Sequence, residues 1–216
     1  MQFKVDLHSH SIISHDGGIT APQYRELLEQ GIVDFIAVTD HNKIDLALAL
    51  RAELGDKIIV GEEVMTSEGE VIGLFLKTFI KTGMSAAQTA QAIKNQGGLV
   101  YIPHPFEITR HGLSSESLEA IKTQVDIIEV FNARSKEPWL SPKAKAFAEE
   151  NDIAKAASSD AHHLPGVGQT YSLVEDRPDQ TNLKMLLAKA TYQEKKAGLA
   201  SILAPTINRT RKFFKV

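Results

Sequence analysis

The chain has 216 residues, of which 43% are hydrophobic, so it can build the core of one α/β domain. Its formal net charge of −3 argues against a surface built for nucleic acid or anionic membranes. The absence of cysteine excludes disulfides and thiolate metal sites and leaves nitrogen and oxygen ligands. No signal peptide and no apolar run of about 20 residues stand out, so we expect a cytoplasmic protein without membrane contact.

Short β-branched runs alternate with helical segments along most of the chain. The runs that predict buried strands are Phe3–Leu7, Phe35–Thr39, Lys57–Val60, Val71–Leu76, Leu99–Ile102, Val125–Phe131 and Ile153–Ala157. The segments that predict helices are Pro22–Gln30, Ile44–Leu54, Ser85–Gln96, Ser117–Thr123, Pro142–Glu150 and Leu183–Lys196. A hairpin is expected between Lys57–Met65 and Val71–Leu76. The β-then-α order favours an α/β barrel or a doubly wound sheet.

We find no repeat and no linker, so residues 1–216 are interpreted as a single domain. The basic, aromatic stretch near residues 205–216 is predicted to be a solvated or packed tail rather than a binding site.

Most of the eight histidines stand at the ends of the predicted strands. The first strand ends on His8 and His10, and imidazoles at positions i and i+2 of an extended strand point to the same side. Further strands are followed by His41, Glu63, His104, Asn132, Asp160 and His162. Because the carboxyl ends of parallel strands share one pole of a barrel, this pattern predicts a metal site there.

The motifs around these residues resemble the PHP (polymerase and histidinol phosphatase) superfamily over residues from about 2 to 175. The resemblance is carried by Asp6-Leu7-His8-Ser9-His10, His15-Asp16-Gly17-Gly18, Thr39-Asp40-His41-Asn42, Gly61-Glu62-Glu63, Pro103-His104-Pro105, Glu129-Val130-Phe131-Asn132 and Ser159-Asp160-Ala161-His162. It implies a distorted (β/α)7 barrel with two or three divalent ions at its mouth.

Carried over position by position, the resemblance implies the metal ligands His8, His10, Asp16, His41, Glu63, His104, Asp160 and His162. Glu63 is expected to bridge two ions, and its neighbour Glu62 to be solvated or to support the site. Family members with three metals commonly carry His or Cys where this chain has Asn132, so two metals are the firmer expectation. Imidazole and carboxylate ligands suit Mn, Fe or Zn.

Several neighbours of the ligands are expected to have other roles. Asp6 and Asp40 are predicted to accept hydrogen bonds from ligating imidazoles and to fix their tautomers. His15 and His163 are interpreted as bystanders. Trp139 either stacks on a substrate base or anchors a loop.

A carboxylate-bridged metal pair favours phosphoester hydrolysis, because it generates hydroxide near neutral pH and holds both the attacking and the leaving oxygen. Arg134 is the candidate for binding phosphate oxygens. In the loop after His104, His111 is preferred over Arg110 for contact with phosphate or the leaving group.

The leading hypothesis is therefore a phosphatase acting on a small phosphomonoester, such as a nucleotide, a sugar phosphate or an amino-alcohol phosphate. A nuclease acting on a short oligonucleotide, and a non-enzymatic metal-stabilised module, remain as alternatives. Histidinol phosphate is less favoured as the substrate, because enzymes of that activity are usually longer. The sequence does not indicate the oligomeric state.

Overall fold

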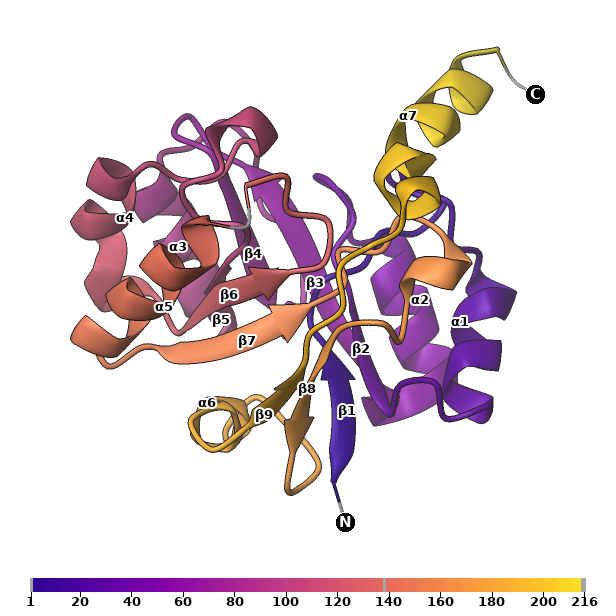
Figure 1. Cartoon of the computed structure of the whole chain (residues 1–216), viewed down its shortest axis with the longest axis horizontal. Helices are drawn as coiled ribbons and strands as arrows, with labels where there is room; N and C mark the ends of the chain where they lie inside the picture. Colours follow the sequence, from indigo (N-terminus) through magenta and orange to yellow (C-terminus); the bar gives the residue numbers. More distant parts are fainter. Residues whose placement is uncertain (1, 138, 215–216) are drawn as a thin grey trace.

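One twisted sheet, covered by helices and curled almost into a barrel, forms the body of the molecule (Figure 1). The computed structural model describes residues 2–137 and 139–214. The strands are β1 (Phe3–Asp6), β2 (Phe35–Val38), β3 (Ile58–Met65), β4 (Glu70–Leu74), β5 (Leu99–Ile102), β6 (Ile127–Asn132), β7 (Ala154–Ser158), β8 (Tyr171–Val174) and β9 (Thr191–Gln193). The helices are α1 (Ala21–Glu29), α2 (Asp45–Leu54), α3 (Ala86–Asn95), α4 (Ser115–Ile121), α5 (Leu140–Glu150), α6 (Leu183–Leu187) and α7 (Leu199–Phe214).

The strand order in the sheet is β7-β6-β5-β4-β3-β2-β1-β8-β9. The pairs β1–β2, β2–β3, β5–β6 and β6–β7 are parallel, whereas β4 is antiparallel to both of its neighbours and β8 is antiparallel to β1. The two ends of the sheet meet through side chains, since the Tyr192 hydroxyl donates to Lys155 O (3.3 Å) and Ala157 N donates to Ser172 Oγ (3.1 Å). The expected α/β barrel of the PHP type is thus confirmed as a nearly closed sheet.

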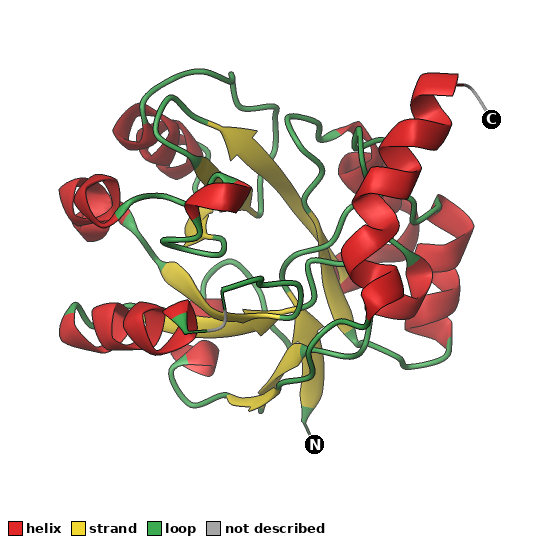
Figure 2. Ribbon diagram, turned by 45° about the horizontal axis from the view of Figure 1, so that its top comes forward, coloured by secondary structure: helices red, strands yellow, loops and turns green. Residues whose placement is uncertain are grey.

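The hydrophobic core has two parts because successive strand residues face opposite sides of the sheet. In β2, Phe35 and Ala37 point into the barrel, and Ile36 and Val38 point outward to the helices. Leucines of α6 pack with the interior side chains of the barrel. Figure 2 shows the helices on the outside of the curled sheet. The helices α1 and α2 lie on one side of the barrel and α3, α4 and α5 on the other.

Two helices begin at residues whose side chains cap the free backbone N–H groups of the first turn. Ser85 and Gln88 form a capping box at α3, and Thr20 with Gln23 forms one at α1. The predicted β3–β4 hairpin is confirmed, with Glu63 opposite Ile72.

One prediction for the C-terminal third is wrong. The segment Leu183–Lys196 is helical only over Leu183–Leu187, because Thr191–Gln193 pairs with the unpredicted strand β8. The segment predicted as a solvated or packed tail belongs largely to a helix, α7, which the sequence interpretation did not predict. A small apolar strip around Ala204 packs this helix against the body. The last two residues of that tail, 215–216, lie outside the described residues. None of the helices described is long and apolar enough to cross a membrane.

Candidate metal centre

The residues predicted as metal ligands converge at the carboxyl ends of the parallel strands. Eight of them lie within contact distance of one another: His8, His10, Asp16, His41, Glu63, His104, Asp160 and His162. All but His41 are almost fully buried. His104 and Asp160 adopt left-handed backbone conformations (φ 28° and 49°), which are uncommon for residues other than glycine and which occur often at functional sites.

One donor cluster has the spacing of a coordination shell. The atoms His8 Nε2, His10 Nε2, Glu63 Oε2 and Asp160 Oδ1 give five measured separations between 3.0 and 3.6 Å. A tetrahedral ion bound at about 2.1 Å places its ligand atoms about 3.4 Å apart. His8, His10 and Glu63 have this spacing among themselves and could hold a divalent ion, with Asp160 beside the two imidazoles.

A second cluster lies next to the first and shares His10. In it, Asp16 Oδ2 lies 3.3 Å from His162 Nε2, and Asp16 Oδ1 lies 3.7 Å from His41 Nε2. Glu63 reaches both groups, because its Oε2 also lies 3.2 Å from His41 Nδ1. This position is consistent with the predicted bridging role of Glu63.

Charge balance also favours cations here. Five buried carboxylates contact the imidazoles, namely those of Asp16, Glu63, Glu70, Glu129 and Asp160. With neutral imidazoles, the guanidinium groups of Arg110 and Arg134 offset two of the five negative charges and leave a net charge of −3. Two divalent ions would reverse that sign, which would suit an anionic substrate.

The pKa values of the donors reflect this crowding. Burial, and then the neighbouring Glu70 carboxylate, raise the pKa of Glu63 to about 7. Burial opposes protonation of His41, but the carboxylates of Glu63 and Glu70 raise the pKa of this imidazole to about 10. Burial and the approach of His162 lower the pKa of His10 well below its usual value. The site thus gathers negative charge that a bound cation would stabilise.

Two site carboxylates were missed by the sequence interpretation. Glu70 begins β4, and its Oε1 lies 3.1 Å from His41 Nδ1. Its backbone N donates to His111 O (2.8 Å), and a Cβ on the preceding Gly69 would lie 2.6 Å from that same oxygen. The predicted hairpin could have identified Glu70 as a site residue. Because Glu63 pairs with Ile72, residues 70 and 72 lie on the same face of the sheet as residue 63.

Glu129 on β6 accepts four hydrogen bonds. Its Oε1 accepts from His8 Nδ1 (3.1 Å) and the Tyr101 hydroxyl (2.7 Å), and its Oε2 accepts from His104 N (2.6 Å) and Asn132 Nδ2 (2.8 Å). Because a carboxylate only accepts, the proton of His8 is assigned to Nδ1, which leaves Nε2 free to bind a metal. Glu129 therefore has the tautomer-fixing role predicted for Asp6 and Asp40.

Those two aspartates bind other groups instead, so the prediction for them is wrong. Asp6 Oδ1 accepts from the backbone N of His8 and of Ser159, and Asp40 accepts from Ser11. Their position one or two residues before a ligand places them beneath the loops rather than beside the rings. Glu62 points away from its neighbour Glu63 and accepts from Ile80 N (2.9 Å) as a buried, not a solvated, side chain.

Asn132 is occupied by other hydrogen bonds. Its Oδ1 accepts from Arg110 Nη1 (3.2 Å) and Arg134 N (2.9 Å), and its amide donates to Glu129 and Asp160. The Arg110 guanidinium also pairs with Asp160 Oδ2. Arg110 thus lies beside Asn132, at the position where a His or Cys ligand would be needed, and it contacts Asp160 directly, although the sequence interpretation preferred His111 in this loop.

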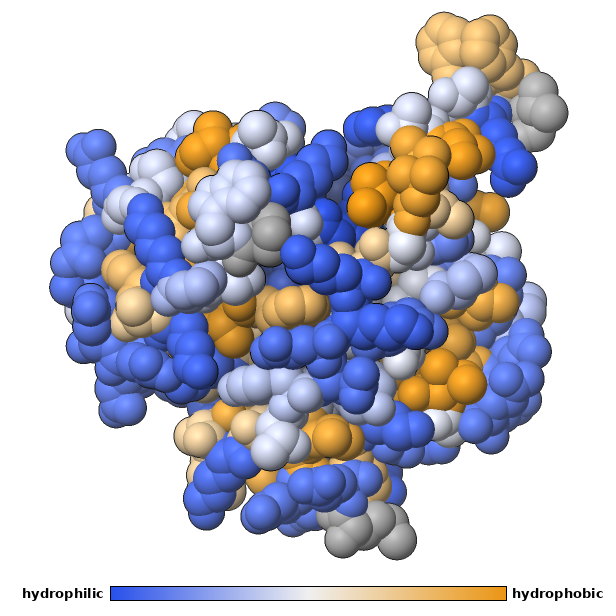
Figure 3. Space-filling view, viewed as in Figure 1, coloured by the Kyte–Doolittle hydropathy of each residue, from blue (hydrophilic) through white to orange (hydrophobic). Residues whose placement is uncertain are grey.

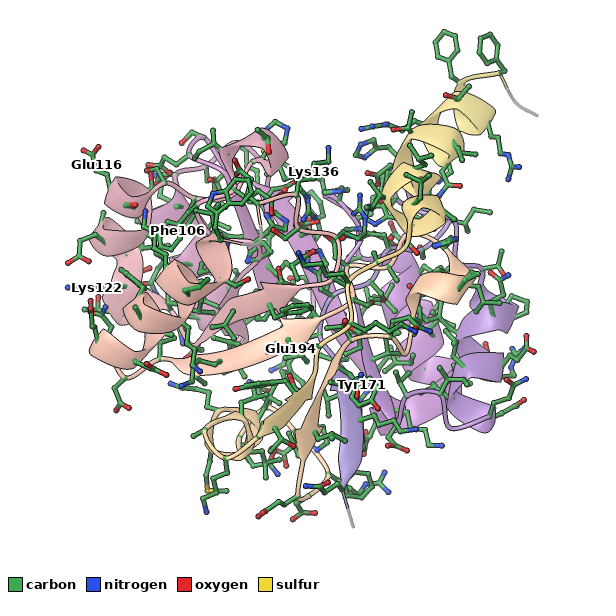
Figure 4. All side chains as sticks on the ribbon, viewed as in Figure 1. Phe106, Glu116, Lys122, Lys136, Tyr171 and Glu194 are labelled. Atoms are coloured by element: carbon green, nitrogen blue, oxygen red, sulfur yellow. The ribbon has the colours of Figure 1, made fainter. Side chains whose placement is uncertain are left out.

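A cavity of about 310 Å³ opens above these groups. Its walls include Arg110, His111, Arg134, Lys136 and Arg209, together with most of the predicted ligands. Arg134 Nη1 lies 3.1 Å from Asp160 Oδ1. Lys136 is labelled in Figure 4, on the connection between β6 and α5.

The remaining candidates are placed as follows. His15 is exposed over 59% of its side chain and lines the cavity, with its ring 5.0 Å from that of His41. His163 Nε2 pairs with Ser201 Oγ of α7 (2.7 Å), a structural position. Trp139 is 66% exposed, so it does not act as a packed anchor.

Comparison with known proteins agrees with this architecture. Over 196 residues, 85% of this chain and 77% of the relative, the sequence is 34% identical to an uncharacterized protein of Methanocaldococcus jannaschii. Residues 141–189 match the model of a family described as PHP-associated. The chain belongs to the PHP superfamily.

Several solved structures share the fold. A two-domain protein of Bacteroides vulgatus that contains a predicted PHP-like metal-dependent phosphoesterase matches with a TM-score of 0.69 at 19% identity, over 97% of this chain and 70% of that one. A lesion-specific endonuclease of Pyrococcus furiosus matches with a TM-score of 0.64 at 15% identity, over 89% and 57%. At these identities the likeness establishes the fold of this PHP protein, and its substrate has to be argued from the site.

Proposed function

We propose that this PHP protein is a metal-dependent phosphoesterase that hydrolyses a small phosphomonoester, such as a nucleotide, a sugar phosphate or an amino-alcohol phosphate. The observation that carries the proposal is the pair of adjoining donor clusters joined by Glu63, with two guanidinium groups beside them on one cavity wall. Manganese, iron or zinc ions held there would lower the pKa of water and neutralise phosphoryl charge.

The side chains of the chain itself supply binding and orientation. The ligands are His8, His10, Asp16, His41, Glu63, His104, Asp160 and His162, with Glu70 beside them. Arg110 and Arg134 are the candidates to hold nonbridging phosphate oxygens through their N–H groups, because both guanidinium groups lie beside Asp160 in the cavity lining. His111, on the cavity wall, is the candidate to protonate the leaving group.

The test is a phosphate-ester screen with metal-replete protein. We expect turnover of p-nitrophenyl phosphate and of one or more natural phosphomonoesters with Mn²⁺, loss of turnover with chelator, and at least a 100-fold loss in Glu63→Gln. Protein loaded with Mn²⁺, Zn²⁺ or Fe²⁺ that releases no phosphate from any ester would refute the proposal.

A nuclease activity is the second candidate, favoured by Arg209 on the cavity wall and by the basic residues that follow it on α7. Comparing a mononucleotide with short oligonucleotides at two salt concentrations separates the two activities, because added phosphate contacts steepen the salt dependence. The small cavity favours the monoester. A non-enzymatic module is supported instead if Asp160→Ala unfolds a protein that never hydrolysed phosphate.

A further inference from the structure

Pro205 and Arg209 of the C-terminal helix α7 (Leu199–Phe214) line the cavity, while the helix leaves much of its own apolar surface in solvent (Figure 3). Leu203 is 46% exposed and Phe213 is 80% exposed. Hydrophobic burial therefore contributes only a small part of its attachment. The remaining attachment consists of a few directional hydrogen bonds, and these end on the loops that carry two predicted metal ligands.

Asn208 joins the two loops directly. Its Nδ2 donates to the carbonyl oxygens of Asp16 and His162, each at 2.9 Å. The two protons of one amide group thus connect residues that are 146 positions apart and whose side chains lie in the same donor cluster. A Cβ on Gly18 would lie 2.9 Å from this amide nitrogen, so a side chain at position 18 would displace the Asn208 amide.

Lys212 holds the first of these loops from a second direction. Its ammonium group donates to Ile12 O (2.7 Å) and Gly17 O (2.7 Å), and also to Ser14 O. Three carbonyl acceptors match the three protons of an ammonium group. The ammonium group of Lys212 therefore holds together three carbonyl groups of the loop that carries Asp16.

From these contacts we infer that α7 holds the metal centre in shape. Asn208 and Lys212 are positioning residues for the cluster of His10, Asp16, His41 and His162. The inference rests on the metal centre of the proposed function and adds a segment that the sequence interpretation assigned to a tail. Among the described residues, Asp16 is the one carboxylate that belongs to this cluster alone, whereas Glu63 lies between the two clusters, so displacing the loop of Asp16 would weaken this cluster and leave the one around His8 and Glu63 intact.

The test measures Mn²⁺ binding by titration calorimetry and by elemental analysis of the full chain. Asn208→Ala and Lys212→Met are expected to lose affinity for one of the bound ions by about 10- to 100-fold, as for other residues that orient ligands, while the other ion is retained. Lys212→Arg should restore part of the affinity. Thr210→Ala is the matched control on α7, because the Thr210 hydroxyl bonds only within the helix, to Thr206 O.

Unchanged stoichiometry and affinity in Asn208→Ala and Lys212→Met would overturn the inference. Hydrogen exchange of the wild-type protein provides a measurement that needs no variant: Mn²⁺ should slow the exchange of amides in residues 11–18 and 199–214 together, and equal exchange with and without Mn²⁺ would also overturn it. If the wild-type chain binds no Mn²⁺, the metal centre itself is wrong and this inference fails with it. Binding by the wild type with unaffected variants refutes the role of α7 alone.

Discussion

Replacing Glu129 with glutamine should prevent His8 Nε2 from binding a metal, although the His8 side chain itself stays in place. All four partners of this carboxylate donate to it, and two of the donors, His104 N and the Asn132 amide, cannot become acceptors in place. In Glu129→Gln, the side-chain oxygen must therefore accept from His104 N and the Asn132 amide. The side-chain NH₂ group of the glutamine then faces His8 Nδ1 and the Tyr101 hydroxyl. His8 can accept from that NH₂ only by moving its proton to Nε2, the atom that faces Glu63 and Asp160.

The magnitude follows from this tautomer change. Loss of a carboxylate behind a ligating imidazole typically costs 10- to 100-fold in metal affinity, or about 1.4–2.8 kcal/mol. We expect Glu129→Gln to show that loss in a Mn²⁺ titration, with a matching loss of phosphoesterase activity at limiting metal.

Asp126→Asn provides the control. Asp126 is a buried carboxylate that accepts from Val100 N (2.8 Å) just before the start of β6, the strand that carries Glu129, at the pole away from the donors. This variant should lose stability and keep its metal affinity. If Glu129→Gln binds Mn²⁺ as tightly as the wild type, or if Asp126→Asn loses as much affinity, the assigned orientation of His8 is wrong.

Three further predictions concern metal number, metal removal and pH. Arg110→Met combined with Asn132→His should bind one more Mn²⁺ per chain than the wild type by elemental analysis, whereas Asn132→His alone should not, because the guanidinium still occupies that corner. Chelation of metal held at about 100 times its dissociation constant should remove about 2.7 kcal/mol of stability, or roughly 5–10 °C in Tm by calorimetry. Burial raises the pKa of Glu62 from 4.5 to about 7, so the folded state holds its proton more tightly and stability falls as pH rises between these values. Glu62→Gln should therefore gain about 2 kcal/mol over the wild type in urea unfolding at pH 8 relative to pH 4, and equal gains at both pH values would contradict this.

The sequence allowed the donors at strand ends to be predicted because position and chemistry coincide there. A His or Asp that follows a short apolar run has few reasons to be present other than the shared pole of the barrel, as His104 and Asp160 illustrate. The β3–β4 hairpin was equally readable, since Ser67 and Gly69 mark its turn.

Other parts of the site depend on contacts between residues that are far apart in the sequence, and no local sequence pattern indicates these contacts. Glu129 lies within an apolar strand and shows its role only when β1 and β5 bring His8 and Tyr101 to it. Asn208 meets Asp16 across 192 positions of sequence. The short strands β8 and β9 form because they close the barrel, and their four and three residues carry too little periodicity to reveal them.

The contact between the β3–β4 turn and the loop after β5 has a consequence for how substrate preference can change. Glu70 N donates to the carbonyl of His111, and Gly69 leaves no room for a side chain against it. A loop that lines the cavity is thus tied through its main chain to Glu70, a carboxylate beside the donor clusters. Lengthening this loop, in evolution or by grafting, would shift Glu70 as well, so we expect the shape of the cavity to change more readily by exchange of side chains at positions 109–111 than by insertion of residues there.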